Sequence, residues 1–118
     1  MRWALAIILT FCVSPAFAAD GAHLFSDQCA SCHVLTETSS DQGPSLKGVV
    51  WRKVATRQDF SYSGALKSLG GSWSPDRLDS YLRNSQGFAP GNGMYFAVED
   101  PADRQAIIGY LKAPPEGR

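Results

Sequence analysis

The sequence predicts an all-α domain, and three observations lead to this fold class. Two segments, residues 74–82 and the stretch from Asp100 to the prolines at 114–115, each begin with a capping residue followed by a proline, which is the pattern of a helix start. Phe25 and Cys29 are four residues apart and therefore share one face of an earlier helix. No segment has the alternating β-branched residues that indicate a strand. We expect loops to join the helices.

The first 18 residues, MRWALAIILTFCVSPAFA, have the parts of a secretory signal peptide: a basic residue near the start, an apolar run and a small-x-small cleavage site. We expect cleavage after Ala18, which leaves residues 19–118 as one domain in the periplasm. The alternative is an uncleaved anchor. Because the apolar run from Ala4 to Val13 is shorter than the roughly 20 residues that span a bilayer, we expect no stable membrane insertion.

The charge balance argues against a nucleic-acid partner. The chain of 118 residues has 11 basic and 11 acidic side chains, and the 100 residues after the signal have 10 and 11. No basic tract is present, so nucleic-acid binding is not expected. A domain of this length buries a small core and often gains stability from a bound group.

The later helices follow in chain order. The segment SGALKSLGG, residues 63–71, indicates a short helix that two glycines end. Ser74-Pro75-Asp76 starts a helix that we expect to run through Leu82. Asp100-Pro101 starts the last helix, and Pro114-Pro115 ends it.

The motif CASCH, residues 29–33, is the strongest chemical signal in the chain. A zinc site needs four ligands, and the chain after the signal offers only His23 in addition. A thioredoxin-like pair would follow a strand, and a disulfide across two residues closes a very tight loop. Covalent attachment of haem c remains: two thiols bind the porphyrin, and the adjacent histidine binds iron.

A six-coordinate iron needs a second ligand, and Met94 is the candidate. It is the only methionine after the signal and lies in the loop FAPGNGMYF. The proline and glycines of this loop are turn formers that can bring a thioether close to a flat ligand. We therefore expect His/Met ligation by His33 and Met94, with one haem per chain.

These residues belong to a longer pattern, and the chain resembles a class I c-type cytochrome of the mitochondrial cytochrome c and bacterial cytochrome c2 group. The resemblance covers residues 21–112, with Trp73 and the segments GAHLFSDQCASCH, GPSLKG, FSYSGAL, LDSYLRN, APGNGMYF and DRQAIIGYL in order. It implies a fold of about four to five helices and loops around one covalent haem. It also implies a monomeric one-electron carrier between redox proteins, with no catalytic residue.

The resemblance assigns roles around the haem. Cys29 and Cys32 correspond to the thioether anchors, and His33 and Met94 to the axial ligands. Pro44 corresponds to the proline whose carbonyl accepts the other imidazole N–H and fixes the ring.

Four further residues match family positions near the haem. Tyr62 and Trp73 correspond to hydrogen-bond donors to a buried propionate, and Arg52 to an arginine near the propionates. Tyr81 corresponds to the tyrosine beside the methionine sulfur. The resemblance also implies one helix contact, of Gly21 and Phe25 with Tyr110 and Leu111.

Several positions depart from the family pattern. Trp51 and Ala55 stand where glycine is usual, and the bulky Trp51 implies a local rearrangement of its loop. Leu66 replaces an asparagine and Asn92 a threonine that usually support a buried water network near the methionine. We expect these changes to alter the tuning of the reduction potential.

The ring of lysines typical of mitochondrial cytochrome c is largely missing. The segment that ends at the loop methionine, RNSQGFAPGNGM, has Arg83 as its only charge. We therefore expect docking through a neutral haem rim with weak salt dependence.

Three alternatives remain open. The chain could serve one periplasmic dehydrogenase or oxidase, it could keep an open distal site for small ligands, or His23 could replace Met94.

Overall fold

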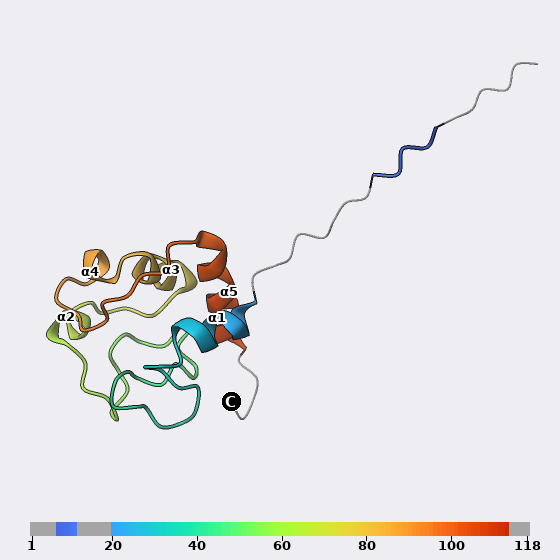
Figure 1. Cartoon of the computed structure of the whole chain (residues 1–118). Helices are drawn as coiled ribbons and strands as arrows, with labels where there is room; N and C mark the ends of the chain where they lie inside the picture. Colours follow the sequence, from blue (N-terminus) through green and yellow to red (C-terminus); the bar gives the residue numbers. More distant parts are fainter. Residues whose placement is uncertain (1–6, 12–19, 114–118) are drawn as a thin grey trace, which may run out of the picture.

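The computed structural model describes residues 7–11 and 20–113. These residues contain five helices, and long loops join them (Figure 1). The expected all-α fold with four to five helices is confirmed. In the described residues the only β-type pairing is an isolated bridge between Lys53 and Ser72. The helices are α1 (Gly21–Gln28), α2 (Gly64–Lys67), α3 (Pro75–Arg83), α4 (Ser85–Phe88) and α5 (Pro101–Lys112).

Most of the expected signal peptide, residues 1–6 and 12–18, lies outside the described residues, so cleavage after Ala18 stays a prediction. The described residues 7–11 have no regular secondary structure, and their large apolar side chains are 77–85% exposed. No helix in the described part of the chain is long and apolar enough to cross a membrane.

Side-chain caps explain where the helices begin. The Ser74 hydroxyl accepts the N–H of Arg77 at 3.2 Å, and the Asp100 carboxylate accepts the N–H of Ala102 at 2.8 Å. Each cap is followed by proline, which fits the first turn because its missing N–H needs no partner there. The helix starts predicted at these two caps are confirmed, and α3 ends at Arg83, one residue later than expected.

The short helices follow the same rule. Ser63 caps α2, and the two glycines expected to end that segment, Gly70 and Gly71, both adopt left-handed φ angles beyond it. Asn84 caps α4, a four-residue helix that the sequence analysis did not predict. Pro114-Pro115, expected to end α5, lies outside the described residues.

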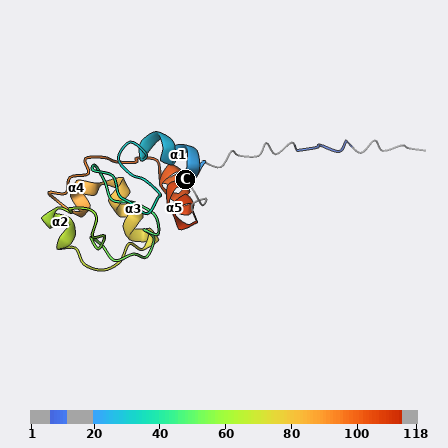
Figure 2. The same cartoon turned by 90° about the horizontal axis from the view of Figure 1, so that it is seen from below.

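The contact between α1 and α5 joins the two ends of the domain, as Figures 1 and 2 show. The rings of Phe25 and Tyr110 pack with centroids 5.7 Å apart, in the place that the resemblance implies. A Cβ on Gly21 would lie 2.3 Å from the Ala106 carbonyl oxygen and 2.8 Å from Tyr110 Cβ. Only glycine therefore permits this approach.

A buried arginine fixes α5 on α3, which lies between α5 and the end formed by α2 and α4 (Figure 2). The Arg104 guanidinium pairs with Asp79 at 2.8 Å and donates to the carbonyls of Val98 and Glu99 at 2.9 Å. Arg104 is only 5% exposed. Because a buried charge is costly unless it is paired and hydrogen-bonded, this set of contacts makes its position specific.

We expect Gly21→Ala to lower the free energy of unfolding by about 1–3 kcal/mol, because the new methyl group forces α1 away from α5. Denaturant unfolding of the holoprotein measures the change. The control is Gly109→Ala in α5, where a Cβ meets nothing within 4 Å. This control should gain about 0.5–1 kcal/mol from lower backbone entropy in the unfolded state. A Gly21→Ala protein as stable as the parent would contradict the close helix contact.

Candidate functional site

A cavity of about 950 Å³ occupies the space between α1, α3, α5 and the loops. This volume is at the upper end of ligand sites, which span about 300–1,000 Å³. The lining is mostly apolar and includes Leu46, Val54, Leu78 and Ile107. All nine site residues named from the sequence line it: Cys29, Cys32, His33, Pro44, Arg52, Tyr62, Trp73, Tyr81 and Met94. His23 is not among the lining residues.

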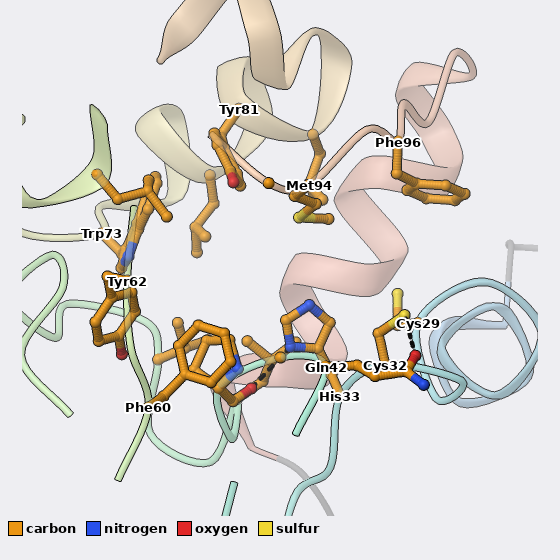
Figure 3. Close-up of a pocket in the computed structure, with 18 of the residues that line it drawn as sticks. Cys29, Cys32, His33, Gln42, Phe60, Tyr62, Trp73, Tyr81, Met94 and Phe96 are labelled. Atoms are coloured by element: carbon orange, nitrogen blue, oxygen red, sulfur yellow. Dashed lines mark hydrogen bonds between the residues drawn. The ribbon is translucent and has the colours of Figure 1, made fainter. Parts of the chain in front are cut away.

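His33 forms one wall of the cavity. Its Nδ1 lies 2.7 Å from the Pro44 carbonyl oxygen, the contact expected from the sequence, so Nδ1–H is the donor. The other ring nitrogen then faces the cavity, as Figure 3 shows. Burial lowers the pKa of His33, the Pro44 hydrogen bond opposes this effect, and the charge of Arg52 adds to the lowering. The ring is thus held neutral, the form that binds metals.

Gly43 gives the imidazole its room, a role that the sequence analysis missed. A Cβ there would lie 2.8 Å from both Cε1 and Nδ1 of His33, and 2.9 Å from the Cys32 carbonyl oxygen. Ser40 holds the same turn, because its hydroxyl contacts the backbone of both Cys32 and Gly43. The glycine before Pro44 was visible in the sequence, but no local pattern links it to a ring ten residues earlier.

The two thiols lie at one edge of the cavity, beyond the end of α1 (Figure 3). The N–H groups of Cys32 and His33 both donate to the Cys29 carbonyl, which turns the chain so that the second thiol and the imidazole reach the cavity. Both cysteines are free thiols. Burial, with a smaller contribution from Cys32, raises the pKa of Cys29 to about 11. The described residues contain no group of three or more metal-ligating side chains of the zinc type.

Met94 lies on the wall opposite His33, and its thioether points into the cavity (Figure 3). The backbone N–H and the backbone carbonyl of Met94 are both hydrogen-bonded. The N–H donates to Asn92 Oδ1 at 2.7 Å, and the carbonyl accepts from the Ser85 hydroxyl. Asn92 is fully buried, so the methionine loop is fastened from inside the protein.

Aromatic side chains close the end of the cavity far from the thiols. Trp73 is buried against Tyr81, with ring centroids 4.9 Å apart, and also stacks on Phe88. The Tyr81 hydroxyl donates to Asn92 Oδ1 at 3.2 Å, and burial raises the pKa of Tyr81 to about 12. Its hydrogen-bond partner is thus the asparagine, and the expected position of this hydroxyl beside the methionine sulfur stays a prediction.

Two polar side chains face the same end. The Tyr62 hydroxyl accepts the N–H of Arg57 at 3.4 Å. Arg52 donates to the carbonyls of Ser45 and Lys47, each at 3.0 Å. Burial lowers the pKa of Arg52, so a cation is held partly desolvated at the cavity wall.

Trp51 adopts a left-handed backbone with φ 70°, and Ala55 does so with φ 58°. Trp51 donates its N–H to the Trp73 carbonyl at 2.7 Å, and Trp73 donates to the Arg52 carbonyl at 2.8 Å. These bonds hold the turn, and the Trp51 side chain is 66% exposed. The expected effect of the bulky residue was a rearranged loop; the structure shows a strained left-handed residue with its side chain directed outward. Such a residue costs about 1–2 kcal/mol.

This helical fold around a cavity with two thiols, an imidazole and a thioether is that of a class I c-type cytochrome. A family model described as Cytochrome c matches residues 18–113, and the chain belongs to that family. Members of the family carry one covalent haem c and are electron carriers rather than enzymes.

Individual relatives agree with this assignment. The chain is 37% identical over 94 residues to a cytochrome c of Gibberella zeae, covering 78% of this chain and 89% of that protein. It is 38% identical over 96 residues to cytochrome c-type cyt cy of Rhodobacter capsulatus, covering 80% of this chain but 48% of that longer protein. Among solved structures, cytochrome cH from Methylobacterium extorquens has a TM-score of 0.72 and 34% identity, covering 80% of this chain and 98% of that one.

The residues present fit haem c. The cavity has apolar walls for the porphyrin, two free thiols at one edge, and a neutral imidazole nitrogen that faces into it. A partly buried cation stands at the wall near Tyr62, where an anionic group would be matched.

We expect Trp51→Gly to be about 0.5–1 kcal/mol more stable to unfolding than Trp51→Ala. Glycine relieves the roughly 1–2 kcal/mol of left-handed strain. Its greater freedom in the unfolded chain lowers the free energy of unfolding by about 0.5–1 kcal/mol, which offsets part of this gain. Both variants remove the same exposed side chain, so their difference isolates the backbone. Denaturant unfolding measures it, and equal stability of the two variants would show that this residue stores no strain.

Proposed function

We propose that this chain is an exported, periplasmic carrier of single electrons whose iron is held by His33 and Met94. The observation that carries the proposal is the facing of these two side chains across one cavity, with both thiols at its edge (Figure 3). Imidazole and thioether are the ligand pair that raises a haem's reduction potential. The arrangement is closed on both sides, as suits electron transfer without binding of substrate.

The haem supplies an iron that alternates between the ferrous and ferric states. Cys29 and Cys32 would anchor it through thioether bonds, and His33 would be kept in one orientation by Pro44. The soft sulfur of Met94 favours the ferrous state. The apolar walls act in the same direction, because burial penalises the extra positive charge of the ferric state.

Arg52, Tyr62 and Trp73 are proposed to receive the haem propionates. A partly buried guanidinium is stabilised by an anion, and in the described part of the chain the hydrogen bonds of Arg52 go to neutral carbonyls. Tyr62 and Trp73 line the same end of the cavity and bring an O–H and an indole N–H to it.

Export is proposed from the sequence of residues 1–18, which has a basic residue near its start, an apolar run and a small-x-small cleavage site. The exposed apolar side chains of residues 7–11 support it, since a soluble domain gains nothing from displaying them. We propose residues 19–118 as the mature domain.

Electron transfer is proposed to occur at the cavity edge near the thiols. Among the exposed side chains that line the cavity there, Asp27 is charged. The others are neutral: Ser31, Gln42, Tyr95, Phe96 and Ala97. Residues 84–98 contain no charged side chain. A neutral edge of this kind favours docking by an uncharged partner surface.

We expect electron self-exchange between reduced and oxidised copies to change by less than about threefold from low to moderate ionic strength, because the edges that meet are nearly uncharged. Nuclear magnetic resonance line broadening in mixtures of the two states measures the rate. The control carries Ser31→Lys, Gln42→Lys and Ala97→Lys, and its self-exchange should accelerate strongly with salt as repulsion is screened. An equally steep dependence in the parent protein would contradict the neutral edge.

We expect carbon monoxide, at concentrations that saturate the Met94→Ala protein, to leave the visible spectrum of the dithionite-reduced holoprotein almost unchanged, because His33 and Met94 would hold the iron from both sides and the thioether leaves only rarely. The Met94→Ala protein, with one position open, should bind carbon monoxide readily. Ready binding by the parent protein would overturn the closed-site proposal in favour of an open distal site for small ligands.

A further inference from the structure

Asn92 is a fully buried amide two residues before Met94, and all four of its side-chain hydrogen-bonding positions are used. Its Oδ1 accepts the backbone N–H of Met94 at 2.7 Å and the Tyr81 hydroxyl at 3.2 Å. Its Nδ2 donates to the carbonyls of Ser85 and Ala89 at 2.9 and 2.8 Å. The chemistry of these partners fixes the amide orientation, since an N–H needs an acceptor and a carbonyl needs a donor.

These partners join three parts of the structure at one side chain. Tyr81 belongs to α3, Ser85 begins α4, and Ala89 follows α4. The Asn92 backbone adds two bonds, from its N–H to the Ala89 carbonyl at 3.1 Å and from Gln86 Nε2 to its carbonyl at 2.8 Å. A buried polar network that is fully satisfied holds one arrangement specifically.

One further hydrogen bond holds the loop around Met94, from the Gly91 N–H to Gln86 Oε1 at 3.2 Å. Gly91 and Gly93 flank the asparagine, are exposed, and contribute no side chain, and the next residue, Tyr95, is 80% exposed. Glycines lower the resistance of a loop to rearrangement because they add backbone freedom. The bonds of Asn92, together with the Ser85 hydroxyl on the Met94 carbonyl, therefore supply most of the hydrogen bonds that order this segment.

We infer that Asn92 is a positioning residue for the iron ligand: it holds the Met94 thioether toward His33 and sets how rarely that thioether leaves. The inference rests on the proposed function, in which Met94 is the ligand. Tyr81 acts on Met94 through Asn92, because its hydroxyl donates to the amide oxygen.

Two substitutions test the amide. Asn92→Thr offers a single hydroxyl in place of two donors and two acceptor sites. Asn92→Asp keeps the shape, but an ionised carboxylate cannot donate to the Ser85 and Ala89 carbonyls. The matched control is Asn84→Ala, which removes the cap of α4 in the same region without touching Met94. All three should lower the global stability.

The readout is the affinity of the reduced holoprotein for carbon monoxide, measured by visible titration, beside denaturant unfolding of each variant. The apparent affinity is proportional to the fraction of molecules whose methionine has left. Loss of buried hydrogen bonds should raise that fraction, so Asn92→Thr and Asn92→Asp should bind carbon monoxide at least about tenfold more tightly than the parent. Asn84→Ala should stay within about twofold of the parent, since the amide network is intact.

Tyr81→Phe gives a milder test that does not depend on folding of the asparagine variants. It removes one of the four bonds and should tighten carbon monoxide binding a few-fold, about threefold. If the asparagine variants did not fold, unchanged binding in Tyr81→Phe would overturn the inference.

The two proposals fail in different ways. If the parent excludes carbon monoxide while the Asn92 variants bind it no better than Asn84→Ala does, the inference is wrong and the proposed ligation stands. If the parent binds it as tightly as Met94→Ala does, ligation by Met94 is wrong and the inference falls with it.

Discussion

The separation between the two walls of the cavity is the constraint on which the rest of this structure depends. One wall carries His33 and follows α1, and the other carries Met94 and precedes α5. The walls are joined where α1 meets α5, and the distance between these helices is set by Gly21, which lets the backbone of α1 touch the Ala106 carbonyl. This helix contact therefore holds together the two segments that carry the imidazole and the thioether. Arg104 extends the same connection to α3.

Within each wall the functional side chain is held by bonds to backbone groups rather than by regular secondary structure. The imidazole of His33 is oriented by the Pro44 carbonyl and has room because residue 43 is a glycine. The segment of Met94 is fastened by the buried amide of Asn92. Loops can place ligands with this accuracy because each polar group that the fold buries is given a specific partner, and an alternative loop path would leave several of them unpaired.

The sequence predicted the features that local chemistry specifies. The starts of α3 and α5 follow from a cap and a proline, and the nine residues expected around the cofactor all line one cavity. Features that depend on tertiary contacts could not be predicted. The helix α4 is four residues long and contains a glycine, so it has no periodic pattern to detect. Nothing local shows that Gly43 faces the imidazole, or that Arg104 is buried against Asp79.

The two main departures from the family pattern have opposite physical effects, and each lies on a different side of the cavity. At Trp51 the chain accepts a strained left-handed backbone, which the hydrogen bonds with Trp73 maintain. With the Trp51 side chain directed outward, the next residue, Arg52, lines the cavity and donates to the carbonyls of Ser45 and Lys47. At Asn92 the chain instead gains bonds, since an amide joins four groups where a hydroxyl could join fewer. The strain lies near Arg52 and the added hydrogen bonds lie near Met94. Both features are consistent with a site whose two ends stay fixed in position while the charge of the bound group changes by one.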